Sequence, residues 1–274
     1  MLWLSPTLLG MTLFVAVPFV AVIVLATLDW RLVDTPRWSG VENLVAVLGS
    51  TRFWNAAGVT LLLSVIVVPV QLGAGLVLAK LLTARVSGVR VMRPVFLVPW
   101  AMAPLTLGVI ARWIFSPSDG LVAGLAGHRV DWLVDPFLAP LLVAGVVSWQ
   151  GAGFTALLYG NALGAISDDL RAAASLDGAG AWRTLIAVEL PLLRRTTLFL
   201  SVASLAQTSG LYDVIVTLTG GGPGTSTTTL SYLIVQTVWQ QFDIGAAAAM
   251  SVVTTAIMLV IVAVLFRLLG EGAR

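Results

Sequence analysis

The sequence DDLRAAASLDGAGAWRTLIAVELP, from Asp168 to Pro191, interrupts a chain that otherwise consists largely of long apolar runs. It alternates small residues, charges and scattered large apolar side chains, a composition that suits contact with another protein better than burial in lipid. Its length fits two short helices, with a turn at Asp177 and Gly178 because glycine tolerates unusual backbone conformations. We expect the Asp177 carboxylate to cap the second helix. The stretch therefore predicts a docking element between membrane helices.

A helix that only lies on the membrane surface is the alternative for this stretch. Such a helix has a broad, bulky apolar face flanked by lysines. The run of alanines from Ala172 to Ala174 instead leaves one face thin enough for close approach by another protein.

The composition around this stretch is that of a membrane protein. Of the 274 residues, 58% are hydrophobic and 10% are charged, compared with roughly 25% charged residues in a soluble domain. The mean hydropathy is +0.99. A net charge of +2 is too small to indicate nucleic-acid binding. Without cysteine, the chain has no disulfide framework and no thiolate metal site.

Six stretches are apolar enough to cross a bilayer as helices, which takes about 20 residues. They cover residues 4–28, 56–82, 95–115, 137–163, 196–218 and 245–269. The first is longer than the core of a signal peptide and lacks a basic leading segment, so we expect a retained span. Pro69 predicts a kink in the second, and Pro99 with Pro104 argues against a straight third helix. We therefore expect one all-α membrane domain over residues 1–274.

Basic residues predict the orientation, because Lys and Arg gather on the cytoplasmic side of a membrane. With residues 168–191 inside, ten basic residues lie inside and five outside. The inner set is Lys80, Arg85, Arg90, Arg93, Arg171, Arg183, Arg194, Arg195, Arg267 and Arg274, and the outer set is Arg31, Arg37, Arg52, Arg112 and Arg129. Both termini are then cytoplasmic, and the chain is a multi-pass protein of the cytoplasmic membrane.

The residues of several enzyme classes are missing. A P-loop needs a lysine after glycine, but the single lysine, Lys80, stands between Ala79 and Leu81. One histidine, His128, cannot supply the paired ligands of an intramembrane metalloprotease. We therefore expect no catalytic residue, no metal and no cofactor bound by this chain.

Few ionisable residues fall inside the predicted spans, where ion-coupled transporters usually carry several. The candidates are Asp213 and Asp243, and an interfacial carboxylate bonded to backbone or arginine is the simpler interpretation of Asp213. The chain is thus expected to take its energy from a partner. An ion-coupled secondary transporter remains the alternative from another class.

Several short motifs occur in a familiar order. Ala173, Ala174, Asp177, Gly178, Ala179 and Pro191 have the spacing of the EAA loop, which reads EAA, two residues, DGA and a run to Leu-Pro. Ala172 occupies the position of the motif glutamate. Leu218–Pro223 (LTGGGP), Ser39–Asn43 (SGVEN) and Asp243 with Gly245–Ala248 add three matches elsewhere. Over nearly its whole length the chain resembles permease subunits of ABC importers, in the maltose-type, sugar-importing branch.

The resemblance implies a type I ABC importer fold in which residues 168–191 form coupling helices. It implies a membrane-spanning subunit of an ATP-driven carbohydrate importer, with half of the solute pathway. The implied partners are a second permease, two ATP-binding subunits that carry ATP and Mg, and an extracytoplasmic solute-binding protein. A permease for a non-sugar solute such as a glycerol-phosphate is the alternative, although no arginines cluster within the spans.

A sugar site combines amides, hydroxyls and aromatic plates. The fourth and fifth spans offer that mixture at positions that match the sugar-contacting stretches of maltose-type permeases. The candidates are Trp149, Gln150, Gly151 and Phe154 on the fourth span, and Ser204, Gln207, Thr208 and Leu211 on one face of the fifth. Contact with a neighbouring helix is the alternative role for each.

Two further sets flank this pathway. We expect Tyr212 and Asp213 to act as gate or scaffold. Gly220, Gly221, Gly222 and Pro223 are expected to form a turn presented to the external solute-binding protein, with a simple hairpin between spans as the alternative.

Overall fold

The computed structural model describes residues 5–83, 94, 97–126, 128–129 and 131–270. Four of the ten basic residues predicted for the inner side, Arg85, Arg90, Arg93 and Arg274, lie outside these ranges. So do residue 4 of the predicted first span and residues 95–96 of the third.

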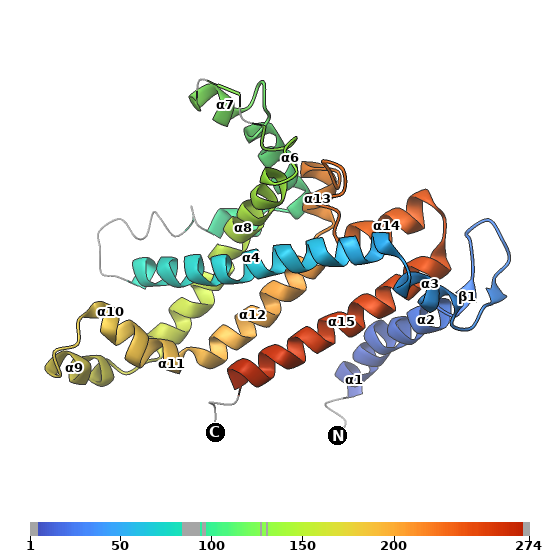
Figure 1. The fold of residues 1–274 in the computed structure, drawn as a ribbon. Coiled ribbons are helices and arrows are strands. Elements are labelled where there is room, and N and C mark those ends of the chain that lie inside the picture. Colours follow the sequence, from blue (N-terminus) through green and yellow to red (C-terminus); the bar gives the residue numbers. More distant parts are fainter. Residues whose placement is uncertain (1–4, 84–93, 95–96, 127, 130, 271–274) are drawn as a thin grey trace.

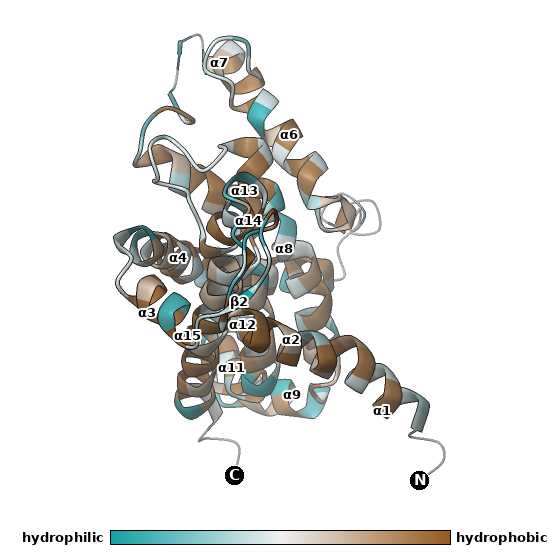
Figure 2. Cartoon of the chain, turned by 90° about the vertical axis from the view of Figure 1, so that its right-hand side faces the viewer, coloured by the Kyte–Doolittle hydropathy of each residue, from teal (hydrophilic) through white to brown (hydrophobic). Residues whose placement is uncertain are grey.

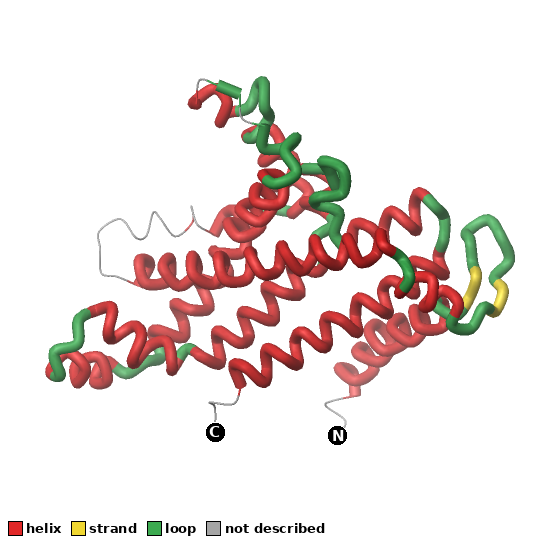
Figure 3. Tube along the Cα trace, in the orientation of Figure 1, coloured by secondary structure: helices red, strands yellow, loops and turns green. Residues whose placement is uncertain are grey.

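The chain is almost entirely helical (Figures 1 and 3). Its helices are α1 (Ser5–Met11), η2 (Thr12–Ala16), α2 (Val17–Leu25), α3 (Glu42–Leu48), α4 (Thr51–Thr83), α6 (Pro104–Ile114), α7 (Leu121–Ala126), α8 (Leu138–Gly164), α9 (Asp168–Leu176), α10 (Ala181–Thr184), η3 (Leu185–Glu189), α11 (Leu190–Leu192), α12 (Arg194–Ser209), α13 (Asp213–Leu218), α14 (Leu230–Gln240) and α15 (Ile244–Gly270). Strands β1 (Leu28–Asp29) and β2 (Arg37–Trp38) form a short antiparallel hairpin, with Leu28 opposite Trp38.

Four helices in the described part are long and apolar enough to cross a membrane. They cover Ser5–Leu25, Thr51–Leu82, Leu138–Gly164 and Ile244–Leu268 and correspond to the first, second, fourth and sixth predicted spans. The first, formed by α1, η2 and α2, is hydrophobic over nearly its whole surface (Figure 2). Because most of its large side chains are exposed in this chain, this helix needs a lipid or protein neighbour.

The third predicted span is interrupted, as its prolines indicate. Residues 97–101 are helical, Ala103 has an extended backbone, and α6 begins at Pro104. Proline suits the first position of a helix because the missing N–H has no partner there in any case.

The fifth predicted span differs from the expectation of one continuous helix over residues 196–218. Helix α12 ends at Ser209, and α13 begins at Asp213. Gly210 follows the last residue of α12, and the carbonyl of Leu211 accepts a hydrogen bond from the Thr229 hydroxyl at 2.9 Å. Helix α14, whose first residue follows Thr229, thus supplies the partner that a continuous helix would otherwise provide.

Helix α4 runs through the centre of the molecule and makes its most extensive contact with α8 (Figure 1). It contributes Leu63 and Val67 to a core with α6, α8 and α13, and Phe53 to a second core with α2, α14 and α15. Near its end, Ala79 packs in a third core with residues of α8 and α12. Helix α4 therefore takes part in all three of these cores.

The hairpin and α9–α11 occupy opposite ends of the molecule (Figure 1). At the hairpin end, Asn43 donates hydrogen bonds to the carbonyls of Ala26 (3.1 Å) and Leu28 (2.8 Å). Asp243 accepts from the Ala246 N–H at 2.9 Å and so caps α15, and a Cβ added to Gly245 would overlap the Leu28 carbonyl. The Ser39–Asn43 and Asp243–Ala248 motifs therefore stabilise one junction between the hairpin and α15.

Candidate functional site

A cavity of about 180 Å³ lies among α4, α8 and α12. Its lining residues are Gln71, Trp100, Gly151, Phe154, Leu200, Ala203, Ser204 and Gln207. None of these described lining residues carries a charge. The cavity combines two amides, one hydroxyl and two aromatic rings, which is the mixture expected for an uncharged polyhydroxyl solute.

Gln71 fixes one wall of this cavity. Its side-chain oxygen accepts a hydrogen bond from Ser204 of α12 at 3.0 Å, and its nitrogen donates to Thr155 of α8 at 3.3 Å. A Cβ added to Gly151 would overlap the Gln71 amide. The absence of a side chain at Gly151 thus lets a polar group of α4 reach between α8 and α12.

An aromatic pair forms a second wall. The rings of Trp100 and Phe154 are stacked, with centroids 5.5 Å apart and planes 19° from parallel. Gln207 borders the same cavity, and none of the described residues forms a hydrogen bond with its side-chain amide. The cavity therefore presents an apolar plate together with an amide that has free hydrogen-bonding capacity.

The structure brings together half of the predicted pathway residues: Gly151, Phe154, Ser204 and Gln207 all line this cavity. Sequence reasoning missed Gln71, Trp100, Leu200 and Ala203. Gln71 carries a usable signal, because a glutamine inside an apolar run needs a buried polar partner. Trp100 carries no such signal in the sequence, because its place beside the cavity depends on the break in the helix before Pro104.

The other four predicted residues lie elsewhere. Trp149 is half-exposed and borders an apolar groove between α6 and α8. Gln150 donates to the Met102 carbonyl at 3.2 Å, and the Thr208 hydroxyl donates to the Ser204 carbonyl within α12 at 2.8 Å. Leu211 is buried beyond the end of α12, so the predicted shared face of the fifth span stops at Thr208.

Residues 168–191 form two short helical segments, as the sequence predicts. Helix α9 ends in a turn in which Gly178 has φ +76°, the Gly178 N–H donates to Ser175 O (3.1 Å) and the Ala179 N–H donates to Ala174 O (2.9 Å). This pair of bonds satisfies the last carbonyls of a helix and favours glycine at the left-handed position.

The prediction that Asp177 caps the second helix is wrong. Asp177 is the C-cap residue of α9, and α10 starts after Gly180 with no side-chain cap. Ser167 caps the other end of α9, accepting from the Asp169 N–H at 3.2 Å. The connection between α9 and α10 covers residues 177–180, two residues longer than the expected turn at Asp177 and Gly178. Asp177 therefore lies too far from the start of α10 to cap it.

The outer face of α9 and α10 is open to solvent. Leu176 is 89% exposed and Trp182 is 73% exposed. Ala172, Ala173, Asp177, Gly178 and Pro191 are exposed, and Ala174 and Ala179 are half-buried.

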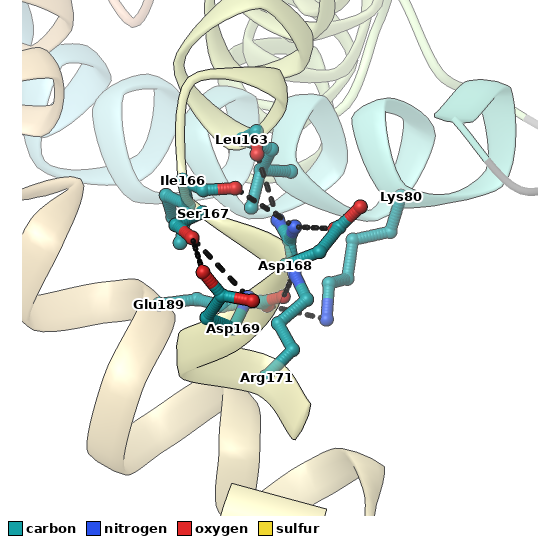
Figure 4. A network of polar contacts seen from close by, with 8 residues as sticks. All are labelled: Lys80, Leu163, Ile166, Ser167, Asp168, Asp169, Arg171 and Glu189. Atoms are coloured by element: carbon teal, nitrogen blue, oxygen red, sulfur yellow. Dashed lines mark hydrogen bonds and ion pairs between the residues drawn. The ribbon is translucent and has the colours of Figure 1, made fainter. Parts of the chain in front are cut away.

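The inner face of the same segment holds an ion cluster around the buried Glu189 (Figure 4). Glu189, only 4% exposed, lies 3.2 Å from Arg171 and 2.5 Å from Lys80 of α4. Arg171 also donates to the carbonyls of Leu163 (2.7 Å) and Ile166 (3.1 Å), at the end of α8. Sequence reasoning missed Glu189, although an isolated glutamate in the apolar run LIAVELP predicts a cationic partner.

Side-chain hydroxyls hold the backbone carbonyls of the glycine-rich turn after α13. Thr227 donates to Gly222 O (2.8 Å), Thr228 to Gly221 O (3.0 Å) and the Tyr232 hydroxyl to Gly220 O (2.9 Å). Positive φ angles at Gly220 (63°) and Gly221 (87°) explain the glycines. Pro223 follows Gly222 through a cis peptide bond.

Tyr212 and Asp213, the predicted gate or scaffold, lie at the break between α12 and α13. The Tyr212 ring stacks on Tyr232 of α14 with centroids 6.1 Å apart. Asp213 is half-buried in the first turn of α13, where a negative charge stabilises the helix.

The profile of one protein family, the binding-protein-dependent transport system inner membrane component, matches residues 71–271. The sn-glycerol-3-phosphate transport system permease protein UgpA of Agrobacterium fabrum is 32% identical over 83% of this chain and 79% of its own length. The sulfoquinovosyl glycerol transport system permease protein SmoG of the same organism is 30% identical over 98% of this chain and 89% of its own. A crystal structure of a bacterial ABC transporter involved in import of the acidic polysaccharide alginate superposes with a TM-score of 0.84 at 22% identity, over 99% of this chain and 95% of that one.

Proposed function

Because the chain belongs to the family of binding-protein-dependent transport system inner membrane components, we propose that it is the membrane-spanning subunit of an ATP-driven carbohydrate importer. The observation that carries the carbohydrate assignment is the uncharged cavity with its Trp100–Phe154 plate and its amides from Gln71 and Gln207. A sugar ring has an apolar face that stacks on aromatic rings and hydroxyls that bond amides.

We propose that the bundle crosses the membrane six times, with α9–α11 and both termini on the cytoplasmic side. The interrupted segments 97–114 and 194–218 supply the third and fifth crossings. Breaks at membrane depth are tolerated where the freed backbone groups find partners within the protein, as the Leu211 carbonyl does with Thr229. The basic residues of the described inner end, including Lys80, Arg171 and Arg194, support this orientation.

Residues 168–191 are proposed to dock on a separate ATP-binding subunit. The exposed face with Leu176 and Trp182 supplies apolar contact area, and Ala172 and Ala173 keep α9 thin enough for close approach. ATP and Mg would then bind the partner, and a second permease with its own ATP-binding subunit would complete the pathway. The turn Gly220–Pro223 after α13, held by hydrogen bonds from Thr227, Thr228 and Tyr232, is proposed as the surface for the solute-binding protein.

A glycerol-phosphate permease is the second candidate. The identity with UgpA favours it, whereas a phosphate group requires cationic or N–H partners and none of the described lining residues is charged. The cavity thus favours a neutral sugar over a phosphorylated solute.

Uptake into proteoliposomes that contain the whole complex tests these assignments. Labelled maltose and labelled sn-glycerol 3-phosphate are offered with the solute-binding protein, with and without internal ATP. ATP-dependent uptake of the neutral sugar supports the proposal, and selective uptake of the phosphate ester replaces it with the second candidate. Uptake without ATP by this chain alone would indicate a secondary transporter.

A further inference from the structure

We propose that Glu189 is a positioning residue that passes movement of the docking helix α9 to α4 and α8, two of the three helices that line the cavity. This inference rests on the proposed function, because it concerns how the ATP-driven movement reaches the solute site. It is carried by the bridge from Arg171 through Glu189 to Lys80 (Figure 4).

The bridge joins three elements that the sequence separates widely. Arg171 lies on α9, Glu189 ends η3, and Lys80 lies in the last turns of α4. Glu189 is 4% exposed. A carboxylate that is so well buried is strongly disfavoured unless cations hold it, so moving Glu189 away from Arg171 and Lys80 would be costly.

Lys80 connects this bridge to the cavity along α4. Gln71 lies nine residues before Lys80 on the same helix, about 13 Å away at 1.5 Å per residue. Gln71 holds Ser204 and Thr155 through its amide. A shift of α4 along its axis would therefore alter the hydrogen bonds of the cavity wall.

Arg171 makes a second connection through α8. Its guanidinium donates to the carbonyls of Leu163 and Ile166 at the end of that helix. Helix α8 also carries Gly151 and Phe154, which line the cavity. Glu189 orients Arg171 and thereby links α9 to the parts of the cavity wall that α4 and α8 form.

The competing explanation is that the ion pair only stabilises the fold and has no role in coupling. Variants of Glu189 and Lys80 distinguish these two explanations. Glu189→Gln removes the buried carboxylate, Lys80→Met removes one of its two cationic partners, and the double variant removes both charges. Arg171 keeps Asp168 and two carbonyls in the double variant. Lys80→Arg preserves the charge. Asp131→Asn is the control, because it breaks the exposed ion pair with Arg129 outside the docking segment, and exposed pairs contribute little.

The measurements use the whole complex and compare thermal unfolding with ATP hydrolysis. Coupling is the ratio of hydrolysis stimulated by the loaded solute-binding protein to basal hydrolysis. We expect each single variant to lower this ratio roughly 2- to 30-fold, the range of known coupling effects. The double variant should unfold near the wild-type temperature and still have a low ratio. Lys80→Arg and Asp131→Asn should keep the wild-type ratio.

Three results would overturn the proposal. One is a wild-type ratio in the double variant, and another is a parallel loss of basal and stimulated hydrolysis that follows the amount of folded complex. The third is a complete lack of stimulation in the wild-type complex. That third result would also remove the proposed ATP-driven function, whereas the first two would leave it intact.

Discussion

Gln71 of α4 accepts a hydrogen bond from Ser204 of α12 at 3.0 Å, across 133 residues of sequence. This contact places an amide at the meeting point of the three helices that enclose the cavity. It exists because Gly151 of α8 has no side chain to occupy the same space. The solute site that we propose therefore depends on packing as much as on polar chemistry.

Gly151→Ala should disturb the cavity. The new Cβ would overlap the Gln71 amide, which could give way only by losing its bonds to Ser204 and Thr155, at about 0.5–1.5 kcal/mol each. We expect a lower unfolding temperature of the complex and a changed KM for sugar uptake. Gly145→Ala on the same helix is the control, since nothing lies within 4 Å of its Cβ position. Equal behaviour of the two variants would contradict the packing argument.

Trp100→Ala should weaken solute binding. Aromatic stacking contributes about 0.5–1.5 kcal/mol, so the KM for sugar uptake is expected to rise roughly 2- to 12-fold. Trp149→Ala removes a similar ring from the apolar groove outside the cavity and should leave KM unchanged. If only Trp149→Ala raises KM, the pathway runs along α6 and the cavity is not the site.

Gln207→Ala and Thr208→Ala should differ, although the sequence suggests both for the pathway. Gln207 borders the cavity, and loss of one hydrogen bond to solute, about 0.5–1.5 kcal/mol, should raise KM a few-fold. Thr208 is fully buried and bonds within its own helix, so its variant should affect folding yield only. Initial uptake rates over a range of sugar concentrations distinguish them. Wild-type kinetics in Gln207→Ala would remove this residue from the site.

Gly178→Val should uncouple ATP hydrolysis from uptake while membrane insertion stays normal. The left-handed backbone at Gly178 has φ +76° and costs a residue with a Cβ about 1–2 kcal/mol, more for a β-branched one. Sugar uptake per ATP hydrolysed is the measurement. Gly180→Ala, with φ −68° and nothing near its Cβ position, is the control. Unchanged uptake per ATP in Gly178→Val would count against a coupling role for the turn.

Local sequence signals predicted much of the helical architecture. The long apolar runs gave four helices within a few residues of their expected limits, and Pro99 with Pro104 predicted the interrupted third span. Gly178 marked the turn after α9 because its backbone requirement is local. The break at Gly210–Tyr212 was not predictable in the same way, because the bond from Thr229 that satisfies Leu211 comes from a distant helix.

The sequence by itself determined that this chain is a membrane protein with a polar, helical segment at residues 168–191, because hydropathy and glycine conformation act over neighbouring residues. Only the tertiary structure decided which polar residues meet. It placed Gln71 and Trp100 beside Phe154 and Gln207, and it moved Thr208 and Leu211 into packed contacts. It also paired Glu189 with Arg171 and Lys80. A buried polar group without a partner is costly, but the identity of each partner is fixed by helix packing.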